Sequence, residues 1–96
     1  MRILYGVANN NNDFDVTNIC INILLYGKYI IIPHGDRKRT EMFGDPAPEK
    51  IKSIYIIFSN GTMVTCRQTY RIKINIFTEE VEYMFIGGNH KLKYEI

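Results

Sequence analysis

Apolar and polar residues alternate in several short runs of this chain, a pattern typical of β-strands that expose one face to water. The clearest run sets Ile72, Ile74 and Ile76 between Arg71, Lys73 and Asn75. Strands are expected at 3–7, 28–32, 51–58, 63–68, 71–76, 81–86 and 92–96. Asn60-Gly61 and Gly87-Gly88-Asn89 are hairpin signals between neighbouring strands. We therefore predict a mainly β fold, a small antiparallel β-sandwich of about seven strands with one short helix.

That helix is expected within residues 16–26, where two periodicities compete. Apolar residues recur at helical spacing at Val16, Ile19, Cys20, Ile23 and Leu24. Isoleucines and a leucine also alternate, as in a strand, at Ile19, Ile21, Ile23 and Leu25. The flanking residues favour the helix, because Asp15 stands at an N-cap position and Gly27 at a position typical of helix ends.

A long connection at 33–49 is expected to lack regular structure. It carries all three prolines, the basic run Arg37-Lys38-Arg39 and the segment Phe43-Gly44-Asp45-Pro46-Ala47-Pro48. Loops of this length are uncommon in compact domains and tend to be functional. Asp45 is expected to cap neighbouring amides and so hold the connection in one shape. The basic run could grip an anionic group, or it could simply be solvated.

The hairpin at 54–67 is predicted to be apolar on both faces. A two-residue turn at Asn60-Gly61 would place Ile57 opposite Val64 and Tyr55 opposite Cys66. One face would then carry Ile54, Ile56, Phe58 and Met63, and the other Tyr55, Ile57, Val64 and Cys66. Either the helix of residues 16–26 covers the second face, or that face is an interface with a partner or with a second copy.

Composition narrows the class of protein. Ninety-six residues, 46% of them hydrophobic, form a single domain spanning 1–96. The formal net charge of +2 gives no strong nucleic-acid signal. Cys20 and Cys66 are expected to be reduced and buried, with a bridge between them as the alternative if the protein is exported. No secretory signal or transmembrane stretch is visible, so we expect an intracellular, cytoplasmic protein.

Catalytic and metal-binding patterns are not recognisable in the sequence. The two histidines, His34 and His90, have no cysteine or carboxylate at a metal-ligand spacing. Glu79, Glu80 and Glu82 suggest a solvated strand edge rather than a catalytic pair. We therefore expect no metal, no cofactor and no enzyme activity.

Several segments, in this order, resemble one known family. They are Tyr5-Gly6, Asp15-Val16-Thr17, Gly27, Ile30-Ile31-Ile32, Phe43-Gly44-Asp45-Pro46-Ala47-Pro48, and Lys52 with Ile54, Ile56 and Phe58. Together they resemble the C-terminal domain of the DnaJ subfamily C member eleven proteins over residues 3–76. The resemblance implies a small β-rich domain with a role in protein interaction or membrane-organising assemblies, and no catalytic residues. No J domain is present, so the resemblance does not imply co-chaperone activity.

The sequence therefore favours a non-enzymatic protein-interaction or assembly module. Its binding residues are predicted to be Tyr55, Ile57 and Val64 on the hairpin, and Arg37, Lys38 and Arg39 on the connection. The partner would be another protein or a second copy of the chain. The alternative is a ligand-binding sandwich that recognises carbohydrate or phosphorylated groups through residues 33–49.

Overall fold

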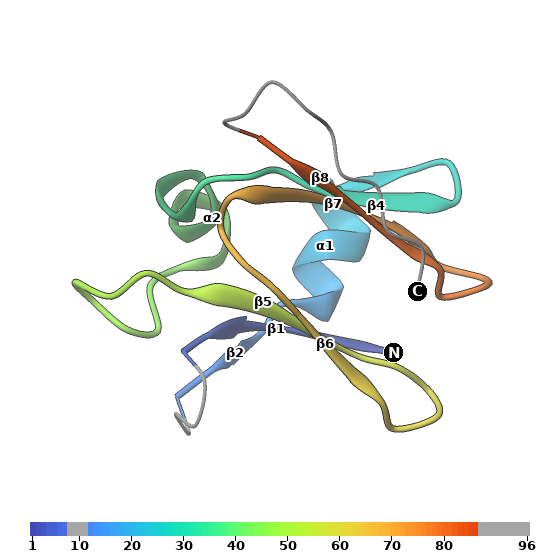
Figure 1. The fold of residues 1–96 in the computed structure, drawn as a ribbon, viewed down its shortest axis with the longest axis horizontal. Coiled ribbons are helices and arrows are strands. Elements are labelled where there is room, and N and C mark those ends of the chain that lie inside the picture. The colour runs from blue at the N-terminus through green and yellow to red at the C-terminus, as the bar shows by residue number, and fades with distance from the viewer. Residues whose placement is uncertain (8–11, 87–96) are drawn as a thin grey trace.

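The computed structural model describes residues 1–7 and 12–86, which form two facing antiparallel sheets and two short helices (Figure 1). The lower sheet in Figure 1 has the strand order β2-β1-β5-β6, and the upper sheet has the order β3-β4-β7-β8. The lower strands are β1 (Arg2–Gly6), β2 (Phe14–Asp15), β5 (Ser53–Ile57) and β6 (Met63–Cys66). The upper strands are β3 (Leu25–Tyr26), β4 (Tyr29–Ile32), β7 (Tyr70–Asn75) and β8 (Val81–Phe85). The mainly β prediction is confirmed.

The hydrophobic core lies between the two sheets. Its lower half comes from β1, β5 and β6, and its upper half comes from β4, β7 and β8. Fully or almost fully buried are Ile3, Tyr5, Ile54, Ile56 and Cys66 below, and Ile30, Ile32, Ile72, Ile74 and Val81 above. Because side chains alternate along a strand, the charged residues Arg71 and Lys73 of β7 lie on the outer face of the upper sheet.

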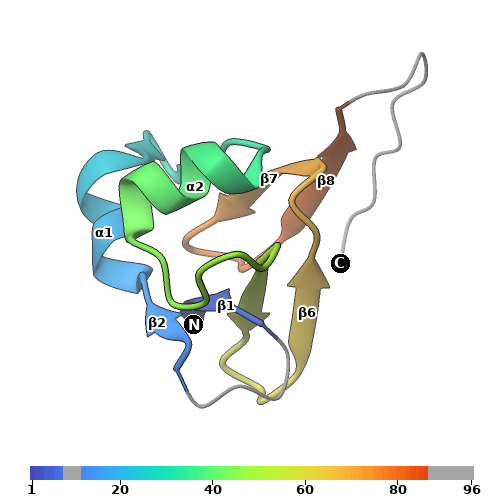
Figure 2. The same ribbon diagram turned by 90° about the vertical axis from the view of Figure 1, so that its left-hand side faces the viewer.

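One side of the sandwich is closed by helix α1 (Thr17–Ile23), which packs on β1, β3 and β4 (Figure 2). Val16 and Cys20 are buried in the core, whereas Ile21 and Ile23 are exposed, so the helical periodicity decides this segment. The Asp15 carboxylate accepts hydrogen bonds from the Thr17 amide at 3.0 Å and from the Thr17 hydroxyl at 2.7 Å. The predicted helix is confirmed but shorter, because Leu24 ends it before β3.

The expectation of an irregular connection at 33–49 is wrong, because helix α2 (Asp36–Phe43) forms within it. Gly35 has a φ of +100°, in the left-handed region, and precedes the helix; Gly44, with a φ of +88°, follows it. Arg39 and Phe43, four residues apart, are buried on one face of the helix. The basic run Arg37-Lys38-Arg39 is therefore part of a helix with one buried and one exposed face.

The predicted hairpin register is also wrong, by one residue. The Phe58 amide donates to the Thr62 carbonyl at 2.9 Å, and the Gly61 amide donates to the Phe58 carbonyl at 2.9 Å. The turn is therefore a three-residue loop at 59–61, with Gly61 at a φ of +87°. The observed pairs are Ile57–Met63, Ile56–Val64, Tyr55–Thr65 and Ile54–Cys66. A shift of one residue moves side chains to the opposite face, so Val64 and Cys66 face the core.

The expected hairpin at 87–89 and the strand at 92–96 lie outside the described residues. Among the residues that are described, no helix has the length and apolar character needed to cross a membrane.

Candidate functional site

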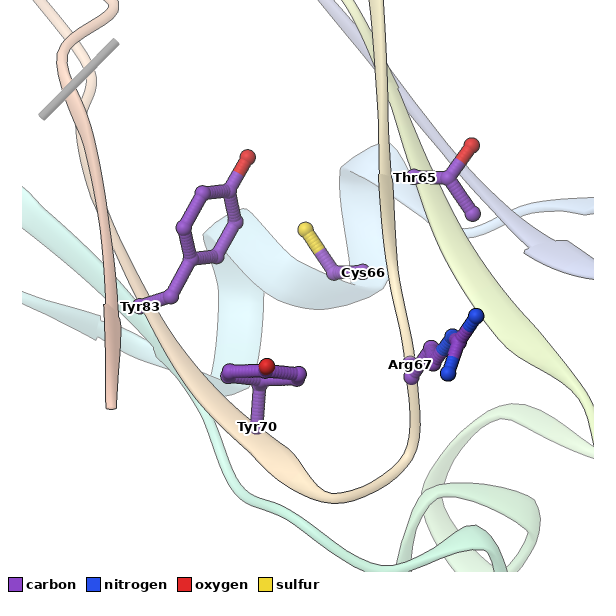
Figure 3. Close-up of a pocket in the computed structure, with 5 residues that line it drawn as sticks. All are labelled: Thr65, Cys66, Arg67, Tyr70 and Tyr83. Atoms are coloured by element: carbon purple, nitrogen blue, oxygen red, sulfur yellow. The ribbon is translucent and has the colours of Figure 1, made fainter. Parts of the chain in front are cut away.

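A pocket of about 280 Å³ lies between strand β6 and strand β8 (Figure 3). Both strands stand on the side of the sandwich away from α1 (Figure 2). It is lined by Thr65, Cys66, Arg67, Tyr70 and Tyr83. Figure 3 shows the Cys66 thiol and the Tyr83 ring pointing toward one another, with Tyr70 beside them. Thr65 and Arg67 project from the other side of the same strand. The pocket therefore has an apolar, aromatic interior, and the β6 backbone forms one wall.

Strand β6 is an edge strand of the lower sheet within the described part of the chain. Hydrogen-bonded and non-hydrogen-bonded pairs alternate along an antiparallel ladder. Since the Phe58 amide bonds to the Thr62 carbonyl, the Ile57–Met63 and Tyr55–Thr65 pairs are the non-hydrogen-bonded ones. The backbone N–H and C=O groups of Met63 and Thr65 therefore point away from β5, along the open edge.

Among the described residues, the open edge lacks two of the features that usually protect an edge strand, a charged side chain and a proline. Strand β6 reads Met63, Val64, Thr65, Cys66, with no charge and no proline. The Met63 side chain is 58% exposed on the outer face. An uncharged edge whose outward backbone groups have no partner within residues 1–7 and 12–86 is a template for pairing with another strand.

Buried Arg39 fixes the inner end of this site. Its side chain is 0% exposed, and its guanidinium donates to three backbone carbonyls. The acceptors are Pro33 O at 2.8 Å, Arg67 O at 3.3 Å and Tyr70 O. Arg67 directly follows β6 and Tyr70 begins β7, so Arg39 holds the turn that carries the chain from the lower to the upper sheet. Burial lowers the pKa of this guanidinium from its ordinary value.

Two of the polar residues that line the pocket, Cys66 and Tyr83, are weak acids whose pKa values are raised. Burial raises the pKa of the Cys66 thiol to about 12, while the nearby Tyr83 hydroxyl and Arg39 lower it in part. Burial also raises the pKa of Tyr83 above its ordinary value. The buried Tyr83 hydroxyl has no hydrogen-bond partner of normal geometry among the described residues. A buried polar atom without a partner costs about 1–3 kcal/mol, so a ligand that accepts or donates here would recover part of that energy.

Three residues of the 33–49 connection, Asp36, Thr40 and Asp45, form a structural cluster with Tyr5 and Lys52. The Lys52 side chain is 2% exposed and bridges Asp36 and Asp45, each at 3.1 Å. The Tyr5 hydroxyl bonds to Asp36 Oδ1 at 3.2 Å and to Thr40 Oγ1 at 2.7 Å. Burial opposes the charge of Lys52, but the hydrogen bonds to Asp36 and Asp45 raise its pKa above the usual value. This cluster joins the start of α2 to β1 and to the start of β5.

Within that segment, the Asp45 carboxylate accepts a hydrogen bond from the Ala47 amide at 3.1 Å, as the capping prediction required. Phe43 is buried against Tyr5, with ring centroids 5.4 Å apart. The edge of the Phe14 ring lies 3.0 Å from the place where a Cβ on Gly44 would stand. Pro46 is half-buried and Pro48 exposed. The segment is thus packed onto the domain and does not form an open loop.

The residues predicted to bind a partner do not form one surface. Tyr55 and Ile57 lie on the outer face of the lower sheet, where Tyr55 is mostly buried, and Val64 faces the core. Helix α1 packs on other strands, so it does not provide the cover expected for that outer face. Arg37 and Lys38 are exposed, and Arg37 pairs with Glu41 at 3.5 Å, whereas Arg39 is buried. The binding roles of these residues stay predictions.

Sequence reasoning missed Thr65, Tyr70 and Tyr83 as site residues. Thr65 looks like an ordinary polar position of a strand, and its importance comes from its backbone. The signal that was available is the uncharged composition of 63–66, which is unusual for an edge strand. Comparisons with protein-family models, with curated proteins and with solved structures found no match. The resemblance to the DnaJ subfamily C member eleven proteins therefore also stays a prediction.

Proposed function

We propose that this domain is a protein-interaction module that binds an extended segment of another protein as an added strand along β6. The observation that carries this proposal is the coincidence of an open, uncharged edge with the pocket beside it. Backbone hydrogen bonds to Met63 and Thr65 would supply affinity, and one side chain of the segment would enter the pocket at Cys66, Tyr70 and Tyr83. Strand addition of this kind is a recurring mode of peptide recognition.

The inward and outward positions of an added strand would meet different surroundings. Inward side chains face the core side, where the pocket volume of about 280 Å³ can hold one small side chain. The unpartnered Tyr83 hydroxyl inside the pocket favours a side chain that carries a hydroxyl and a methyl group, such as threonine. Outward side chains run beside Met63, Thr65 and Arg67.

Blocking the edge tests the proposal. Peptides would first be selected from a displayed random library against the native chain and then titrated against Thr65→Pro. Proline removes the N–H that points away from β5, so edge strands tolerate it while an added strand loses a backbone hydrogen bond. We expect affinity to fall about tenfold or more, since a backbone hydrogen bond and the contact around it are both lost.

Thr65→Val is the matched control, because it keeps the N–H and the β-branched shape. Its affinity should stay within about twofold of the native value if the backbone is the recognised group. Far-ultraviolet circular dichroism of both variants reports whether the sheets remain folded. Undiminished binding of the selected peptides to a folded Thr65→Pro variant would overturn the proposal.

A second copy of the chain is the other possible occupant of this edge, and the test must distinguish it from a partner peptide. Light scattering over a concentration series is expected to give a monomer for the native chain. A native dimer that Thr65→Pro converts to a monomer would assign the edge to a second copy instead. The alternative of an anionic ligand held by residues 33–49 has only Arg37 and Lys38 on the surface to support it, since Arg39 is buried.

A further inference from the structure

We infer that the segment bound along β6 carries an acidic side chain beside Arg67, so that the partner is an extended peptide of apolar and acidic residues. This inference rests on the proposed strand addition and specifies which strands are accepted.

The open edge ends at Arg67. The Arg67 carbonyl already accepts hydrogen bonds from the Tyr70 amide at 3.1 Å and from Arg39 Nη1 at 3.3 Å. Backbone pairing with an added strand would therefore use Met63 and Thr65 and stop before this carbonyl. Beyond Thr65, the added strand would therefore contact the side chain of Arg67 instead of its backbone.

That side chain lies on the outer face. Figure 3 shows Arg67 on the same side of the strand as Thr65 and opposite to Cys66. Arg67 is exposed, and no carboxylate of the described residues lies within ion-pair distance of it. Residues next to each other on adjacent strands interact directly, and opposite charges there are favourable.

Strands β5 and β6 place no acidic side chain on the outer face that could pair with Arg67 in place of the added strand. Outward-facing residues of β5 and β6 are Ser53, Tyr55, Ile57, Met63 and Thr65, all uncharged. An incoming acidic side chain would therefore meet one cation and a neutral surface, and an incoming lysine would meet like charge. The guanidinium can also bind a carboxylate through two parallel hydrogen bonds, which a neutral side chain cannot match.

Two synthetic strand-forming peptides of identical length test this inference. Both peptides have blocked ends and are built from threonine and valine except at the outward positions. One peptide carries glutamate at these outward positions, and the other carries lysine. We expect the native chain to bind the glutamate peptide about three- to tenfold more tightly, the range that adjacent charge pairs on strands provide. The preference should weaken as salt is raised, because Arg67 is exposed.

Charge reversal makes the test decisive. In Arg67→Glu the preference should reverse toward the lysine peptide, and in Arg67→Gln it should disappear. Equal binding of both peptides to the native chain and to Arg67→Glu, with both lost in Thr65→Pro, would overturn the acidic preference and leave strand addition standing. Binding of neither peptide, or binding that Thr65→Pro does not reduce, would overturn strand addition and this inference with it.

Discussion

A cysteine lies between the sheets at each of two opposite sides of the sandwich, and helix α1 covers one of these sides. On the covered side, Cys20 belongs to α1 itself and is 0% exposed. On the other side, Cys66 stands on edge strand β6, next to the pocket and Tyr83. Burial raises the pKa of both thiols to about 12. The difference between the sides therefore lies in what packs across them, and this points to the β6 side as the one that can accept a partner.

The largest expected effect comes from removing the buried cation that holds the β6–β7 connection. Arg39→Leu takes the guanidinium donor from the carbonyls of Pro33 and Tyr70 and leaves the Arg67 carbonyl with the Tyr70 amide alone, and unsatisfied buried groups are costly. We expect the free energy of unfolding to fall by about 3 kcal/mol or more. Urea denaturation measures this change.

Lys38→Leu is the matched control for that substitution, since Lys38 is the exposed neighbour in the same helix. Its effect on the free energy of unfolding should stay within about 0.5 kcal/mol. Similar losses for the two variants would contradict the structural role assigned to Arg39.

A smaller effect should distinguish the two cysteines. Cys20→Ser buries a hydroxyl under α1, and we expect a loss of about 2 kcal/mol in the free energy of unfolding. Cys66→Ser places its hydroxyl beside the unpartnered Tyr83 hydroxyl, where the two can form a hydrogen bond, so the loss should be only about 1 kcal/mol. Denaturation of the two variants side by side gives both values. A larger loss for Cys66→Ser would show that the β6 side is packed as tightly as the α1 side.

The smallest effect is a difference in labelling rate that leaves the fold unchanged. With both thiol pKa values at about 12, only a small fraction is thiolate at neutral pH, and the rate should rise about tenfold per pH unit between mildly alkaline values. At any one pH we expect a maleimide to modify Cys66 several-fold faster than Cys20, because Cys66 lines the pocket between β6 and β8, whereas Cys20 is 0% exposed. Mass spectrometry of peptide fragments gives the two rates. Equal rates in the folded chain would mean that both thiols react through global unfolding.

Much of the fold could be predicted from the sequence because its signals are local. The alternation at 71–76, the Asn60-Gly61 turn and the helical spacing of Val16 and Cys20 depend on neighbouring residues alone. The turn length of the hairpin could not be settled this way, since Asn-Gly fits both two- and three-residue loops, and one residue changed the face of Val64.

The site depends on information that a sequence lacks. Arg37, Lys38 and Arg39 look equivalent in the chain, yet the burial of Arg39 follows from carbonyls that are contributed 28 and 31 residues later. The pocket likewise exists only because β6 and β8, which belong to different sheets, flank the same opening. Composition did indicate the uncharged edge of β6, but its position at the edge comes from the strand order.

The ion cluster of Lys52, Asp36 and Asp45 has a consequence for how this domain can change during evolution. One buried ammonium is shared by two carboxylates, so replacing Lys52 leaves two neighbouring carboxylates without their cation, and replacing either aspartate removes one of the two ion pairs that hold the ammonium. Homologues are therefore expected to keep all three residues or to change them together. A search profile that scores these positions as a linked set would detect distant relatives that position-by-position comparison overlooks.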